Sequence, residues 1–167
     1  MANVPAKNFI VEDSSFTISI IDSSDFFHQK AIDILIKLNK FNLNTLILIP
    51  QIVIYETVVT LVRKGIDKNK VEESIRKLLF LENVRCVDIT ESSLFRFCKN
   101  IKNISGFNLL KTSDFLIASI AKDFSAKIIT FDAQMRNSIK TSYSDIFCCD
   151  NIKEIKDETY DLIKSLN

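Results

Sequence analysis

FIVEDSSF, residues 9–16, is an apolar run that ends abruptly in two carboxylates and two hydroxyls. Apolar residues that stop at an acid are typical of a buried strand that carries a charged side chain to its solvent-facing end. We therefore predict a buried strand at residues 8–11 and expect Asp13 to lie at the edge of a parallel sheet. What this acid does depends on which other residues share that edge.

The composition is that of one ordinary domain, which we predict to span residues 1–167. With 47% apolar residues, a chain of 167 residues can bury a sizeable core. The net charge of +1 argues against binding nucleic acid by bulk electrostatics alone, so any such binding must be local. Glu12 and Asp13 interrupt the N-terminal apolar run, and no run approaches the roughly 20 apolar residues of a membrane span. We therefore expect a soluble, cytoplasmic protein that does not bind membranes.

Predicted strands alternate with predicted helices along the chain. The alternation favours an α/β sandwich with a parallel sheet and right-handed crossovers, in which ligands collect at the carboxyl ends of the strands. After the first strand, further strands are predicted at residues 46–50, 84–89, 127–130 and 146–149. Helices are predicted at residues 14–22, 25–41, 50–64, 70–81, 90–104 and 111–124, with a helical turn after Asp132 and a charged C-terminal helix.

Four carboxylates are predicted to meet at one edge of this sheet. Asp13 and Asp132 each follow a buried apolar strand, whereas Glu56 and Asp114 lie in the first turns of helices that otherwise look buried. Four like charges packed together cost several kcal/mol per ion unless a cation lies among them. Mg²⁺ or Mn²⁺ suits such oxygen ligands. Each acid could instead be a helix cap, except Glu56, which lies too far into its helix.

Two of these acids lie in segments that resemble signatures of the PIN-domain nucleases, and in particular of the VapC-like toxins of toxin–antitoxin pairs. A strand followed by Asp and a hydroxyl residue is matched by IVEDSS, residues 10–15, with Asp13 and Ser14. A strand, a proline and a helix that carries Glu are matched by LILIPQIVIYETVVTLVRKG, residues 46–65, with Glu56.

The other two acids match the remaining signatures, so the resemblance runs from residue 9 to residue 135. An Asp that opens an Ala-containing apolar helix is matched by SDFLIASIAKDF, residues 113–124, with Asp114. A strand that ends in Thr-x-Asp is matched by IITFDAQM, residues 128–135, with Thr130 and Asp132. The chain departs from the family pattern at Phe131, where the family usually has a polar residue.

The resemblance implies a fold, a cofactor and an activity. The fold would be a PIN-like three-layer α/β/α sandwich around a mostly parallel sheet of about five strands. The activity would be that of a ribonuclease in which one or two Mg²⁺ or Mn²⁺ ions are held by the catalytic residues Asp13, Glu56, Asp114 and Asp132.

Several further residues are candidates for supporting roles. Ser14 and Thr130 could orient the carboxylates through hydrogen bonds, or could simply cap helices. The only histidine, His28, is predicted to be a structural residue that makes one hydrogen bond. Basic residues near the acids could bind the RNA backbone, or could be ordinary solvated surface; they are Arg63, Lys64, Lys111, Arg136 and Lys140.

The expected partners are RNA, an antitoxin and a second copy of the chain. Single-stranded or looped RNA is the expected substrate, because its phosphates must reach a recessed cation. The resemblance implies an antitoxin protein, although a PIN-family nuclease of RNA processing would need none. The family and an apolar patch with Phe80 and Leu81 favour a homodimer, while the patch alone could equally be the edge of the core.

Three other classes of protein share parts of this pattern. A response-regulator receiver also begins with an acid pair, but it needs an Asp after its third strand and a later strand-end Lys, neither of which is found. A haloacid-type phosphatase needs Asp-x-Asp after the first strand, and position 15 is Ser15. A non-catalytic PIN-like scaffold is disfavoured because all four acids are present.

Overall fold

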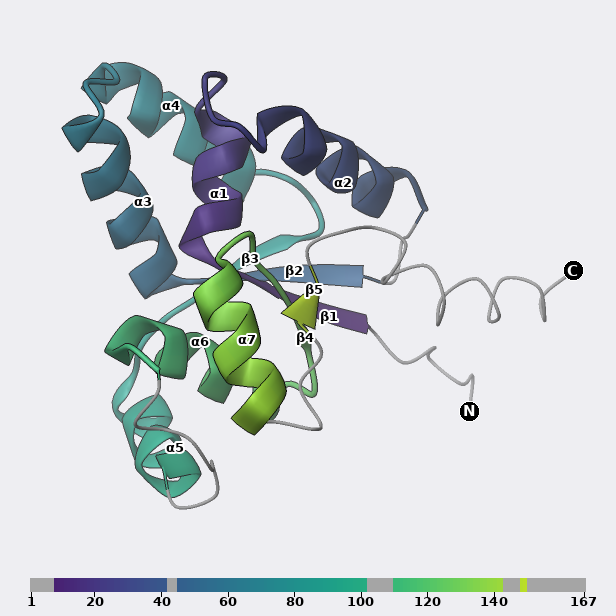
Figure 1. The fold of residues 1–167 in the computed structure, drawn as a ribbon, viewed down its shortest axis with the longest axis vertical. Helices are drawn as coiled ribbons and strands as arrows, with labels where there is room; N and C mark the ends of the chain where they lie inside the picture. The colour runs from purple at the N-terminus through teal and green to yellow at the C-terminus, as the bar shows by residue number, and fades with distance from the viewer. Residues whose placement is uncertain (1–7, 42–44, 102–109, 143–147, 150–167) are drawn as a thin grey trace, which may run out of the picture.

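The computed structural model describes residues 8–41, 45–101, 110–142 and 148–149 (Figure 1). Within that part of the chain, no helix is both long and apolar enough to cross a membrane. The elements are β1 (Asn8–Glu12), α1 (Ser14–Ile21), α2 (His28–Phe41), β2 (Thr45–Pro50), α3 (Gln51–Arg63), α4 (Lys68–Leu79), β3 (Val84–Val87), α5 (Glu91–Ile101), α6 (Thr112–Asp123), β4 (Lys127–Ile129), α7 (Ala133–Ser142) and β5 (Cys148–Cys149).

The strands form one parallel sheet of five strands in the order β3-β2-β1-β4-β5. The first strand is therefore central, with β2 on one side and β4 on the other. Both faces of the sheet are covered, which explains why β1 and β2 are continuous apolar runs and not alternating ones. Because all the strands run the same way, their carboxyl ends share one edge. The predicted α/β fold is confirmed.

Helices cover both faces of this sheet and give three layers. In Figure 1, α1 to α4 gather on one side of the sheet and α5 to α7 on the other. The core between the layers includes Val11, Ile47 and Ile128, none of which has any exposed surface, together with Phe16 of α1 and Ile117 of α6. Burial of each such side chain stabilises the fold by about 1.5–3 kcal/mol. The core thus holds the strand ends and helix starts in fixed positions.

Three helices begin directly after the carboxyl ends of strands. They are α1 after β1, α3 after β2 and α7 after β4. Figure 1 shows α6 starting near the same edge. The sequence predicted this arrangement but placed some helix starts wrongly. The clearest difference is α2, which begins at His28 and not at residue 25, because residues 22–27 form a turn. The N-caps of α1 and α6 are Asp13 and Lys111. The predicted C-terminal helix lies outside the described residues.

Candidate functional site

Asp13 lies at the carboxyl end of the central strand and caps α1. Its backbone N–H donates to the carbonyl of Ile129 on β4 at 3.1 Å. Its Oδ2 accepts three hydrogen bonds, from the Ser15 backbone at 3.2 Å, the Ser15 hydroxyl at 2.6 Å and the Thr130 hydroxyl at 2.7 Å. Its Oδ1 accepts none from the described residues. One carboxylate oxygen is therefore fixed in place, while the other is available to a ligand.

The turn after β4 connects Asp132 to the same hydroxyl groups. The Thr130 Oγ1 that donates to Asp13 accepts the backbone N–H of Asp132 at 2.9 Å. The Ser15 Oγ accepts the backbone N–H of Phe131, also at 2.9 Å. Oδ1 of Asp132 accepts two backbone N–H groups of the first turn of α7 at 2.7 and 3.0 Å. Its Oδ2 has no partner among the described residues, which repeats the division seen at Asp13.

Asp114 lies in the first turn of α6 and is half-buried. Burial, followed by repulsion from Asp13, raises the pKa of its carboxyl from 3.8 to about 6. Asp132 and Glu56 raise this pKa further, and Lys111 lowers it. A nearby like charge disfavours ionisation of a carboxyl, and the effect is stronger where burial reduces screening by solvent. The negative charges of the other three acids are therefore felt at Asp114.

Glu56, the fourth predicted acid, lies in the second turn of α3. Its side chain is partly buried and makes no hydrogen bond to the described residues. Val53 and Thr57, its neighbours on the same helix, are fully buried. No ion pair among the described residues compensates the charge of Glu56, which contributes to the raised pKa of Asp114.

The donor set suits a hard divalent cation. It offers only carboxylate oxygens, among them the free Oδ1 of Asp13 and the free Oδ2 of Asp132, and the like charges raise the pKa of Asp114. As the side chains stand in the described residues, however, no three His, Cys, Asp or Glu groups are close enough to hold one ion. Coulomb repulsion extends further than a ligand bond, so both observations hold.

The hydroxyl that supports Asp13 belongs to Ser15, although the sequence suggested Ser14. The side chain of Ser14 makes no hydrogen bond within the described part of the chain, although Ser14 and Ser15 are both partly buried. An N-cap carboxylate is reached by the residue two positions later, and Ser15 has that spacing. Thr130 does have the contact that was predicted for it.

The predicted basic residues divide into two groups. Lys111 lies beside the acids, as its effect on the pKa of Asp114 shows, and Arg136 lies one turn after Asp132 on α7. Arg63 and Lys64 end α3, roughly two turns beyond Glu56, or about 11 Å along the helix axis. The Nζ of Lys64 pairs with Asp22 at 2.9 Å, and its contact with RNA stays a prediction. The Lys140 side chain lies outside the described set.

Glu12 is an unexpected buried acid next to Asp13. Its side chain has no exposed surface, and its Oε2 accepts the Thr17 hydroxyl at 3.0 Å. Its Oε1 is also buried and has no hydrogen-bond partner among the described residues. Burial raises the pKa of this carboxyl from 4.5 to about 7, and the Thr17 bond lowers it by a smaller amount. Its signal in the sequence is an acid within a strand that is otherwise apolar. The same pattern also fits the end of an apolar run.

Comparisons with solved structures place the fold among toxin structures. Mycobacterium tuberculosis VapC20, described as a sarcin-ricin loop cleaving toxin, has a TM-score of 0.61 and 14% identity, and the match covers 77% of this chain and 94% of that one. VapBC2 from Rickettsia felis, bound to a promoter DNA fragment, has a TM-score of 0.61 and 19% identity, and the match covers 84% of this chain and 97% of that one. VapBC-1 from nontypeable Haemophilus influenzae has a TM-score of 0.58 and 15% identity, and the match covers 85% of this chain and 97% of that one. At these identities the likeness shows the fold.

The sequence itself identifies the family. No curated protein sequence matches the chain. The PIN domain family matches residues 10–138, which run from within β1 to within α7 and include Asp13, Glu56, Asp114 and Asp132. With a match over most of its length, the chain belongs to the PIN-domain family.

Proposed function

We propose that this chain is a metal-dependent ribonuclease and the toxin of a toxin–antitoxin pair. The observation that carries the proposal is that Asp13 and Asp132 each have one carboxylate oxygen fixed by donors and one without a partner among the described residues. Burial raises the pKa of Asp114, and the charges of Asp13, Asp132 and Glu56 raise it further. A protein of a generally nucleolytic family has here a group of acids that is costly without a cation. The site residues, the ion and the RNA substrate are all parts of this proposal.

Each acid has a definite part in the proposed site. Asp13 and Asp132 would present Oδ1 and Oδ2 respectively, with their other oxygens held by hydroxyl and backbone donors. Asp114 and Glu56 would complete the ligand set, and Mg²⁺ and Mn²⁺ are the ions that fit it. When bound, such an ion lowers the pKa of water and stabilises the charge that develops on the phosphodiester.

The protein's own residues prepare the site before any ion binds. Thr130 and Ser15 fix Asp13 through short hydrogen bonds, so the carboxylate is already oriented. Asp114 must lose its proton to bind a cation, and its pKa of about 6 means that the site becomes fully charged only above that pH. Lys111, close enough to lower this pKa, is placed to contact a phosphate.

The substrate and partner follow from the neighbours and from charge. VapC20 is described as a toxin that cleaves the sarcin-ricin loop, which supports RNA as the substrate class. The VapBC2 structure and FitAB bound to a DNA fragment are complexes, which supports an antitoxin partner. The alternative within the family is an RNA-processing nuclease without an antitoxin. An open reading frame of antitoxin size beside this gene would decide between the two.

A cleavage assay tests the proposal. Single-stranded RNA is incubated with the protein and Mn²⁺ or Mg²⁺, and EDTA should abolish cleavage. Asp132→Asn should reduce the rate more than about 100-fold while keeping α7 intact, since asparagine caps a helix as well as aspartate does. Glu72→Gln on α4 is the matched control, because it removes one exposed negative charge far from the acids. Cleavage that survives EDTA, or is equal in both variants, would refute the proposal.

A further inference from the structure

A row of four aromatic rings leads from the core to the surface next to Asp132. Phe16 has no exposed surface and packs against Phe131 at 5.4 Å between ring centroids. Phe131 stacks on Phe27 at 4.7 Å and 18° between ring planes. Phe27 meets Phe26 edge to face at 5.0 Å. Phe26 is 92% exposed, more than any other large apolar side chain in the described residues.

A positive charge lies over the same rings. The Nζ of Lys30 is 5.4 Å from the centroid of Phe131 and 5.9 Å from that of Phe27, which is the range of a cation–π contact. Lys30 makes no ion pair with a carboxylate in the described part of the chain. We call Phe26, Phe27, Phe131 and Lys30 the aromatic ledge. It combines flat apolar rings with a cation that has no carboxylate partner among the described residues.

Polar contacts hold the turn that carries Phe26 and Phe27. Oδ1 of Asp25 accepts the backbone N–H of Phe27 at 3.0 Å and the hydroxyl of Ser19 at 2.9 Å. The Nζ of Lys64 contacts Asp25 at 3.4 Å in addition to its partner Asp22. An Nδ1 contact of 2.8 Å joins His28 to the carbonyl of Ser19. The ledge is therefore ordered before any ligand arrives, which lowers the entropy cost of binding.

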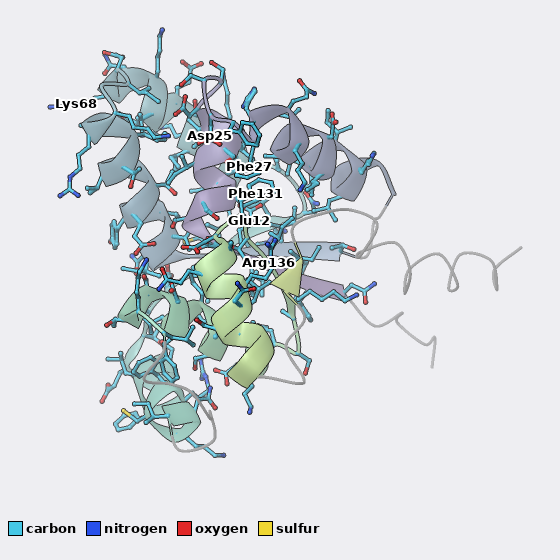
Figure 2. The ribbon with its side chains drawn as sticks, in the orientation of Figure 1. Glu12, Asp25, Phe27, Lys68, Phe131 and Arg136 are labelled. Atoms are coloured by element: carbon cyan, nitrogen blue, oxygen red, sulfur yellow. The ribbon has the colours of Figure 1, made fainter. Side chains whose placement is uncertain are left out.

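The ledge is joined directly to the proposed catalytic acids. Phe131 lies between Thr130, which donates to Asp13, and Asp132. Its backbone N–H donates to the Ser15 hydroxyl that also supports Asp13. In Figure 2, the labels of Phe27 and Phe131 follow one another toward Glu12, the neighbour of Asp13. A ligand bound to the ledge would therefore lie next to the acids and not on a remote surface.

We infer that the aromatic ledge binds an unpaired nucleobase of single-stranded RNA, with Lys30 contacting the adjoining phosphate. Aromatic rings and a cation on one surface match a polymer that alternates π-faces with phosphates. An apolar protein segment would match the rings but would leave the cation without a partner. The inference rests on the proposed function and adds to it how the substrate is positioned.

RNA binding without metal tests the inference separately from cleavage. A short unstructured RNA with a fluorescent end is titrated with protein in EDTA, and anisotropy gives Kd. Phe26→Ala should weaken binding by roughly 5- to 150-fold, the range of one lost base stack. Phe26→Trp should restore it. Phe95→Ala on α5 is the matched control, since Phe95 is 70% exposed on another layer. Because Phe26 is exposed, its removal leaves the core intact.

An RNA with an abasic position distinguishes base stacking from phosphate binding. The wild-type protein should bind the abasic RNA more weakly than intact RNA when the missing base is the one that stacks on the ledge. For the Phe26→Ala variant, the Kd values of these two RNAs should be equal. Equal Kd values for Phe26→Ala and wild type would overturn the inference, even if metal-dependent cleavage stands. So would a shift from dimer to monomer in Phe26→Ala with RNA binding unchanged, because a second copy would then cover the ledge. Base-dependent binding without cleavage would support the ledge and refute the proposed nuclease.

Discussion

Replacing Glu12 with glutamine should change how the stability of the fold depends on pH. The carboxyl is completely buried, one oxygen accepts from Thr17 and the other has no partner. Burial raises its pKa from 4.5 to about 7, so the folded protein binds this proton more tightly than the unfolded chain does. The protonated carboxyl therefore stabilises the fold fully below pH 4.5, and this stabilisation is lost as the pH rises through about 7.

The magnitude follows from the two pKa values. The difference between 4.5 and about 7 corresponds to a loss of about 3 kcal/mol in the free energy of unfolding once both states are ionised. Glutamine does not titrate, and any cost of its unpaired amide is independent of pH. Relative to wild type, Glu12→Gln should therefore gain about 2 to 3 kcal/mol between about pH 5 and about pH 8.

Urea unfolding in EDTA, followed by circular dichroism across this pH range, measures the difference. Asp114 also has a raised pKa, but it titrates in both proteins and cancels in the comparison. Glu72→Gln, which removes an exposed acid of α4, should give a curve nearly parallel to wild type. If the Glu12→Gln curve is also parallel to wild type, the carboxyl is hydrated or partnered and the reasoning is wrong.

Three further outcomes are expected. Asp114→Asn should abolish cleavage and, without metal at neutral pH, should stabilise the fold in urea by removing like-charge repulsion; a destabilised apo protein would contradict this. Thr130→Val should slow cleavage by about 10- to 100-fold, because Asp13 loses its hydroxyl donor; an unchanged rate would show that this bond does not orient the site. Phe80, 83% exposed, should lie in a homodimer interface, so Phe80→Asp should sediment as a monomer where wild type is a dimer; wild type that is itself monomeric at micromolar concentration would refute the dimer.

The main chain of the site could be predicted from the sequence. Buried parallel strands are continuous apolar runs, and the acids at their ends were visible as the residues where those runs stop. Asp13 after β1 and Asp132 after β4 follow from this pattern, and the parallel sheet brings both to one edge. Glu56 stood out because it interrupts an apolar helix face beyond the reach of a cap.

The side-chain contacts could not be predicted in the same way. Ser14 and Ser15 are adjacent hydroxyls, and only the direction of the first turn of α1 selects Ser15. Glu12 looked like the end of a strand because the sequence does not show which face of β1 it occupies. Lys64 is near Glu56 in sequence, but it lies about two helical turns further along the helix axis, where it pairs with Asp22. Each of these contacts is set by rotation about a helix or strand axis.

The location of bound Mn²⁺ tests the central claim most directly. Anomalous scattering from crystals of the protein grown with Mn²⁺ should show an ion at the carboxyl edge of the sheet, bound by Asp13 Oδ1 together with Asp114 and Asp132. The same experiment on Asp114→Asn should show a weaker peak or none. Mn²⁺ bound elsewhere, or no ion at this edge in a preparation that cleaves RNA, would contradict the account.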